Sequence, residues 1–203
     1  MTTSATSTIR RRIEELGPGS IFTPADFRGL DTPSAILNTL SLLVRQNQIV
    51  RLANGVYVLP KRDPLLGAVK PSLDQIVLAI ATKKDARIIP GGAIALNRLG
   101  LSTQVPANPV YLTDGSSRTL TIGNRKVHLK RTAPRYFQIK GEISQLVVQA
   151  LRELGKEGLT EAVRQTVYTK FESEKREHLE HDAQKVPAWI SEVFYSYLNR
   201  GKF

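Results

Sequence analysis

Apolar residues in the first sixty positions follow helical and extended spacings in turn. The first helical face, with apolar residues at i, i+4 and i+7, consists of Ile9, Ile13 and Leu16. Gly17-Pro18-Gly19 ends this helix. Thr23-Pro24 and Thr32-Pro33 each combine an N-cap residue with proline at the first helical position. They predict a short helix through Phe27 and a longer one that ends near Gln48.

An extended pattern follows the longer helix. Two β-rich runs, Ile49–Leu52 and Val56–Leu59, flank Asn54-Gly55. This dipeptide favours a two-residue hairpin turn, because both turn positions take positive φ. The resulting order is helix, short strand, helix, helix and hairpin. It predicts a winged helix-turn-helix domain over residues 1–62.

The longer helix is expected to have two different faces. At about 100° per residue, an apolar face collects Ile36, Leu37, Leu40, Leu43 and Val44. The opposite face collects Ser34, Ala35, Asn38, Leu42 and Arg45. A recognition helix offers its N-terminal outward residues to base edges, and asparagine can pair with adenine through two hydrogen bonds. The outward face therefore predicts DNA contacts, with an ordinary solvated face as the alternative.

The rest of the sequence predicts a second domain over residues 67–203, joined by a linker at 60–64 that contains two prolines. Short strands separated by turn signals occupy 86–131, and amphipathic helices occupy 142–200. The expected fold class is α+β. The winged helix-turn-helix is followed by a mixed α/β domain with a small antiparallel sheet and C-terminal helices.

Charge favours a polyanionic partner. The net charge is +11, and residues 118–140 hold seven basic residues and no acidic one. On the predicted strand the basic residues alternate with Val127 and Leu129, which we expect in the core. The resulting basic strip, an expected contact surface for an acidic protein or a nucleic-acid backbone, consists of Arg118, Arg125, Lys126, His128, Lys130 and Arg131. A solvated sheet face is the alternative.

The sequence lacks signatures of catalysis and metal binding. The absence of cysteine excludes thiol catalysis and cysteine-ligated metal. No glycine pair has the context of a P-loop or a dinucleotide fingerprint. His178 and His181 have a spacing that permits chelation on a helix, but the acidic residues around them are typical of a solvated face. We expect no catalytic residue, no metal and no cofactor.

DNA contacts are expected from three elements of the first domain. The first helix would cross the phosphate backbone, the longer helix would enter the major groove, and the hairpin would lie at flanking phosphates or the minor groove. The residues are Arg10, Arg11, Arg12, Ser34, Ala35, Asn38, Arg45, Arg51 and Asn54.

Two stretches resemble the AbiEi-type antitoxins of the AbiE abortive-infection, type IV toxin–antitoxin systems. IVRLANGVYVLP at 49–60 is similar to the end of their N-terminal domain. Residues 91–120, with ALNRLGLSTQVP and YLTDG, resemble the second domain of shorter, two-domain members. The resemblance implies a bacterial phage-defence protein that represses its own operon by binding inverted repeats. It also implies that the protein counters a nucleotidyltransferase-type toxin.

Two other functions stay open. The second domain could instead sense a small ligand in a transcriptional regulator without a toxin partner, and a nucleic-acid-processing enzyme is the third possibility. No apolar run approaches the ~18 residues of a membrane span. The first residues also lack the apolar region of a secretory signal. We therefore expect a cytoplasmic protein with no membrane partner.

Overall fold

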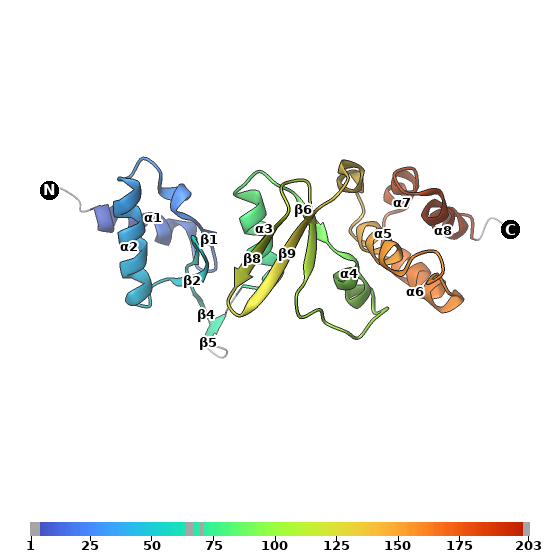
Figure 1. The fold of residues 1–203 in the computed structure, drawn as a ribbon, viewed down its shortest axis with the longest axis horizontal. Coiled ribbons are helices and arrows are strands. Elements are labelled where there is room, and N and C mark those ends of the chain that lie inside the picture. The colour runs from blue at the N-terminus through green and yellow to red at the C-terminus, as the bar shows by residue number, and fades with distance from the viewer. Residues whose placement is uncertain (1–4, 64–66, 70, 201–203) are drawn as a thin grey trace. The chain divides into compact units, whose positions relative to one another are not determined.

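The computed structural model describes residues 5–63, 67–69 and 71–200, so the ends of both predicted domains, 1–4 and 201–203, lie outside the described residues. It is a mixed α+β protein whose backbone divides into two compact units (Figure 1). The first unit runs to residue 84 and includes the turn at 121–124, and the rest of the chain forms the second. Among the described residues, no helix combines the length and apolarity needed to cross a membrane.

The first unit begins with a helix, a short strand, a 3-10 helix, a second helix and a hairpin. These elements are α1 (Ala5–Leu16), β1 (Ile21–Phe22), η1 (Pro24–Phe27), α2 (Pro33–Arg45), β2 (Val50–Ala53) and β3 (Val56–Val58). β3 lies between β1 and β2 and is antiparallel to both. The two predicted Thr–Pro helix starts are confirmed, since η1 and α2 begin at Pro24 and Pro33.

The core of this unit joins the two helices to the sheet. Phe22 of β1 packs edge-on against Phe27 of η1, with ring centroids 5.6 Å apart, and stacks with Tyr57 of β3 at 6.1 Å. The complete buried cluster is Ile9, Ile13, Phe22, Phe27, Ile36, Leu40, Leu43, Ile49 and Tyr57. Leu16, predicted on the same face as Ile9, is 38% exposed at the end of α1.

The predicted linker contains a strand. β4 (Lys61–Asp63) pairs antiparallel with β5 (Gly67–Val69), and the intervening residues 64–66 lie outside the described part of the chain. α3 (Leu73–Thr82) follows. It begins with a capping box in which Ser72 Oγ accepts from the Gln75 N–H and Gln75 Oε1 accepts from the Ser72 N–H.

The second unit contains a four-stranded sheet followed by helices. Its elements are β6 (Ile88–Pro90), α4 (Gly92–Leu99), β7 (Val110–Thr113), β8 (Arg118–Ile122), β9 (Arg125–Arg131), η2 (Pro134–Gln138), α5 (Glu142–Leu154), α6 (Glu161–Phe171), α7 (Arg176–Ala183) and α8 (Ala188–Leu198). α4 packs closely against α5 (Figure 1). The apolar core runs from the sheet through α4 and α5 into the C-terminal helices.

The expectation of an antiparallel sheet is wrong for one pairing. The strand order is β6-β7-β9-β8, and β7 pairs with β9 in parallel register, with Val110 opposite His128 and Leu112 opposite Lys130. β6 and β7 are antiparallel. The parallel pair arises because β8 occupies the edge of the sheet and leaves the position beside β7 to β9.

Two carboxylates from distant positions hold the start of α5. Asp182 of α7 is fully buried, and its two oxygens accept hydrogen bonds from the backbone N–H groups of Lys140 and Gly141, each at 2.9 Å. Glu174 accepts from the N–H of Ile143 at 2.9 Å. These bonds satisfy N–H groups that a helix N-terminus leaves unpaired, and they place negative charge at its positive end.

We had expected His178 and His181 to lie on a solvated charged face. Instead, each histidine lies beside one of these two carboxylates. His178 Nδ1 lies 3.0 Å from Glu174, and His181 Nδ1 lies 2.7 Å from Asp182. Burial raises the pKa of the Glu174 carboxyl, but hydrogen bonds from His178 and from backbone N–H groups outweigh this and lower the pKa below its ordinary 4.5.

The lowered pKa of Glu174 predicts a component of acid sensitivity. The ionised carboxylate stabilises the fold above pH 4.5, and this contribution is lost as pH falls through the lower pKa of the folded state. We expect Glu174→Gln to reduce the free energy of unfolding at neutral pH by about 1–3 kcal/mol. The difference in free energy of unfolding between the variant and the wild type should shrink as pH falls. Urea unfolding followed by circular dichroism at a series of pH values measures it. Glu172→Gln, at an exposed position, should track the wild type. Equal acid slopes for wild type and Glu174→Gln would contradict this role.

Candidate nucleic-acid interface

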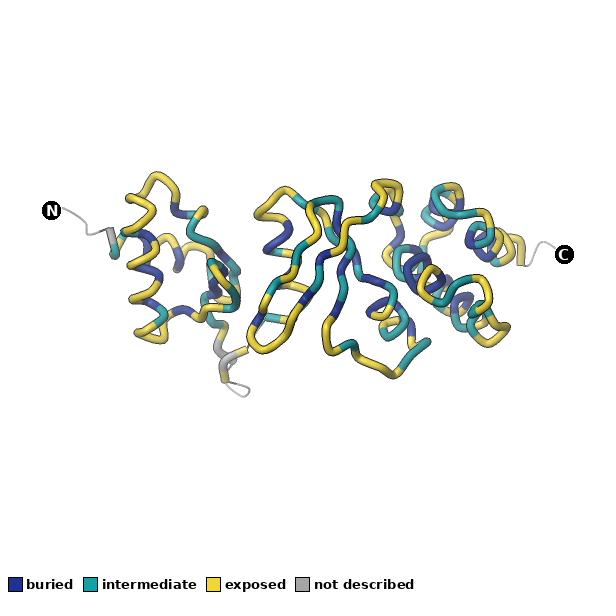
Figure 2. Tube along the Cα trace, in the orientation of Figure 1, coloured by how far each residue is buried: buried dark blue, intermediate teal, exposed yellow. Residues whose placement is uncertain are grey.

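The helix α2 is fixed by its cap and by one buried face. Thr32 Oγ1 accepts a hydrogen bond from the Ala35 N–H at 3.3 Å, and Pro33 occupies the first turn. The buried residues recur at helical spacing, as the alternation of burial along the trace indicates (Figure 2), and they are Ile36, Thr39, Leu40 and Leu43. This packing determines which residues of α2 face outward.

The outward face of α2 carries most of the residues predicted to read DNA. Ser34, Asn38 and Arg45 are exposed, and Ala35 is half-buried. The assignment of Leu37 to the core is wrong, because its side chain is 46% exposed and Thr39 is buried in its place. Leu37 lies about 100° around the helix from Ile36, at the margin of the buried arc.

The hairpin carries a cation that is held by its own turn. Arg51 Nη2 donates to Asn54 Oδ1 at 2.8 Å, and Arg51 Nε donates to the Ala53 carbonyl at 3.4 Å. The predicted turn geometry is wrong in one respect. Gly55 has a φ of 67°, whereas Asn54 is not among the described residues with positive φ. A register shift between Arg51 and Ala53 accompanies this turn, and such irregularities change the local twist of a hairpin.

The three arginines of α1 have different surroundings. Arg11 and Arg12 are exposed and both lie near Glu15, at 3.7 and 3.2 Å. Exposed ion pairs of this kind contribute little stability, so phosphate groups could replace Glu15 as the partner.

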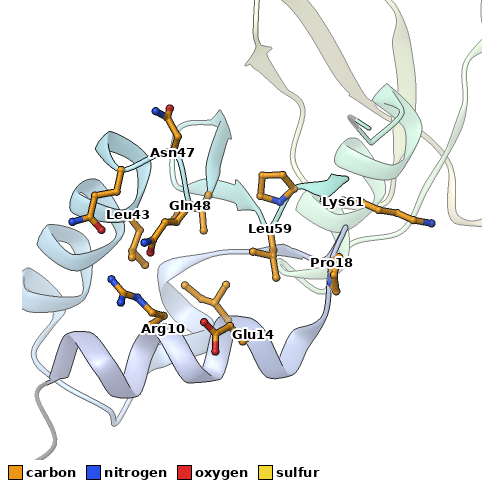
Figure 3. Close-up of a pocket in the computed structure, with 12 residues that line it drawn as sticks. Arg10, Glu14, Pro18, Leu43, Asn47, Gln48, Leu59 and Lys61 are labelled. Carbon is orange, nitrogen blue, oxygen red and sulfur yellow. The ribbon is translucent and has the colours of Figure 1, made fainter. Parts of the chain in front are cut away.

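Arg10 is half-buried, and its Nε has no hydrogen-bond partner among the described residues. It lines a pocket of about 830 Å³ together with Glu14, Gln48 and Lys61 (Figure 3). The adjacent positions 10, 11 and 12 therefore do not form one uniform basic surface.

The basic strip lies in the second unit. Val127 and Leu129 are buried, as predicted, while Lys126 and Lys130 are exposed. His128 is half-buried, and its Nδ1 lies 3.0 Å from Thr119 Oγ1 on β8. The remaining cations of the strip are Arg118, which is half-buried, and the exposed Arg125 and Arg131. The predicted residues therefore form two sets, one in each unit.

The structure also brings together residues that sequence reasoning missed. A pocket in the second unit joins Lys130 and Arg131 of the strip to Gln149 and Arg152 of α5. The signal that could have found it is Gln149 itself, a polar residue inside the apolar run VVQAL.

Fold and surface together define a mixed α+β protein. One unit exposes a capped helix and a hairpin, and the other carries a row of basic residues on its sheet. Residues 8–179 match the protein family DUF6088, a family of unknown function, and the chain belongs to this family. No curated protein matches the chain.

The position of Arg51 predicts its effect on DNA binding. If Arg51 contacts a DNA phosphate, Arg51→Ala should weaken binding to any DNA sequence and reduce the slope of log affinity against log salt by about 1, because that contact is lost. Fluorescence anisotropy at a series of salt concentrations measures this slope. Lys156→Ala, which removes one exposed charge from the other unit, serves as the control and should leave the slope unchanged. If Arg51→Ala also leaves it unchanged, Arg51 does not contact a DNA phosphate.

Proposed function

We propose that this chain is a DNA-binding antitoxin, without enzymatic activity, that represses its own operon and neutralises a nucleotidyltransferase-type toxin in the cytoplasm of a bacterium. The observation that carries the proposal is the outward face of α2. It begins directly after a capped start and presents small polar residues, Ser34 and Asn38, followed by Arg45 about two turns further along. This is the composition that a helix needs to enter a major groove.

Residues 1–62 of the first unit are best interpreted as a winged helix-turn-helix. The order α1, β1, η1, α2, β2, β3 supports this assignment, as does the sheet order β1-β3-β2. In it α2 is the recognition helix and the β2–β3 hairpin is the wing. Ser34, Ala35 and Asn38 would meet base edges, while Arg45 and Arg51 would meet phosphates.

Charge supports a nucleic-acid partner. The net charge of +11 supplies the attraction to phosphates that provides most of non-specific DNA affinity. Binding to inverted repeats would require two copies of the chain on one operator, because a two-fold symmetric site mirrors a two-fold symmetric protein pair.

The antitoxin half of the proposal rests on the resemblance of residues 91–120 to AbiEi-type antitoxins and on the basic strip. Lys126 and Arg125 are exposed on β9 and have no acidic residue near them in sequence. An exposed row of one charge sign suits an acidic partner surface, since complementary charge steers association and selects the partner.

The contribution of Asn38 can be tested on the operator. We expect Asn38→Ala to weaken binding to the upstream region of its own gene by about 1–3 kcal/mol and to relax specificity at one base pair, because a paired contact to adenine is lost. Electrophoretic mobility shifts with a panel of single-base operator variants measure both effects. Ser41→Ala, an exposed change further along α2, is the matched control. If Asn38→Ala keeps full affinity and specificity, the assignment of α2 as the recognition helix is wrong.

Toxin neutralisation is tested separately by growth. The full-length chain should restore growth of cells that express a neighbouring nucleotidyltransferase-type toxin, and Asn38→Ala should do so equally well if neutralisation is independent of DNA binding. We expect Arg125→Glu with Lys126→Glu to abolish rescue, because reversed charge repels an acidic partner. Rescue by the charge-reversed chain would show that the strip is not the contact, and failure of the wild type would reject the antitoxin proposal.

A further inference from the structure

A second pocket lies wholly within the second unit, away from the residues proposed to read DNA. It has a volume of about 420 Å³, within the usual range for small-molecule sites. Four elements converge on it: the N-terminus of α4, the strands β7 and β9, and α5. Its principal polar residues are Lys130, Arg131, Thr132, Gln149, Arg152 and Glu153.

The first turn of α4 provides backbone donors. α4 starts after Gly91, which makes no side-chain cap, so the N–H groups of the first turn are without the partner that a capping residue supplies, and the Glu153 carboxylate lies beside Gly92. Glycine is required at position 91, because a Cβ there would lie 2.4 Å from the Val110 carbonyl oxygen of β7. The close approach of helix and strand leaves the helix N-terminus, with its partial positive charge, at the pocket.

A buried amide provides an independent indication of a ligand. Gln149 is 2% exposed and lines the pocket. Its Oε1 accepts from Arg152 Nη1 at 2.8 Å, and because arginine can only donate, the orientation of the amide is determined. Gln149 Nε2 is then a buried donor with no partner in the described part of the chain. Such unpaired donors are rare and costly unless something else accepts from them.

The charged groups around this donor are predominantly cationic. Lys130, Arg131 and Arg152 line the pocket, against the single carboxylate of Glu153. Arg152 is held in place by the ring of Tyr136, with its guanidinium carbon 3.9 Å from the ring centroid. A guanidinium fixed in this way can bond an anion with two parallel hydrogen bonds.

We propose that this pocket binds the phosphate group of a nucleotide. The orphan amide of Gln149, the first-turn N–H groups of α4 and the cations of β9 and α5 supply donors for phosphate oxygens. Val110 and Leu112 supply apolar wall for the sugar or base. A free nucleotide and the 5′-phosphorylated end of a nucleic acid share this chemistry. The proposal does not depend on DNA binding by α2.

The test uses the full-length protein and isothermal titration calorimetry. Probes are inorganic phosphate, adenosine and guanosine mono- and diphosphates, and a short single-stranded oligonucleotide with and without a 5′-phosphate. We expect phosphate-dependent binding that weakens at least tenfold in Gln149→Leu and in Lys130→Ala, because each loses a hydrogen bond to a charged group. Lys156→Ala, exposed in the same unit but outside both the pocket and the basic strip, should bind like the wild type.

The outcomes separate the two sources of phosphate. Tight binding of a nucleotide identifies the free nucleotide as ligand, and preference for the 5′-phosphorylated oligonucleotide over its unphosphorylated form identifies a nucleic-acid end. Gln149→Leu removes the unpaired buried donor and also the acceptor of Arg152 Nη1, so thermal melting without ligand is measured beside binding to show that the variant is folded. Binding of no probe by the wild type, or unaltered binding by Lys130→Ala and Gln149→Leu, overturns the proposal. Duplex binding through α2 should be the same in these variants.

Discussion

The start of α5 is held by two carboxylates from further along the chain. Asp182 accepts from the N–H of Gly141, 41 residues before it, and Glu174 accepts from the N–H of Ile143, 31 residues before it. Much of the second unit depends on this connection. It ties the C-terminal helices to α5, and α5 packs on α4 and carries Gln149 into the pocket. A buried carboxylate with two backbone donors is oriented by both, so it fixes the helix register more narrowly than apolar packing alone.

The first unit depends on apolar packing instead. Phe22 and Phe27 lie in the middle of its core and contact each other edge-on. They hold β1 and η1 against α2. Because α2 buries the face that packs on this core, Ser34 and Asn38 on its other face are exposed. The two units therefore position their candidate sites by different means. One orients a helix face by burying the opposite face, and the other orients pocket residues by anchoring the end of a helix.

Features encoded within a few residues could be predicted from the sequence. The Thr–Pro starts of η1 and α2 and the alternation of β9 depend on local caps and on a period of two, so they agree with the structure. Features that depend on distant partners could not. The parallel pairing of β7 with β9, the burial of Asp182 and the pocket at Gln149 each require segments far apart in sequence to meet. The DNA-contact assignments remain predictions, because exposure of Asn38 is necessary for contact but not sufficient.

Lys130 and Arg131 belong both to the basic strip and to the pocket. A phosphate group bound in the pocket would add negative charge beside the strip, which would reduce its attraction for an acidic partner. By linkage, an acidic partner bound to the strip would weaken phosphate binding by the same factor. The antitoxin and ligand-sensing functions are therefore not exclusive in physical terms. Shared cations provide a direct route by which a nucleotide could compete with a protein partner for the same charge.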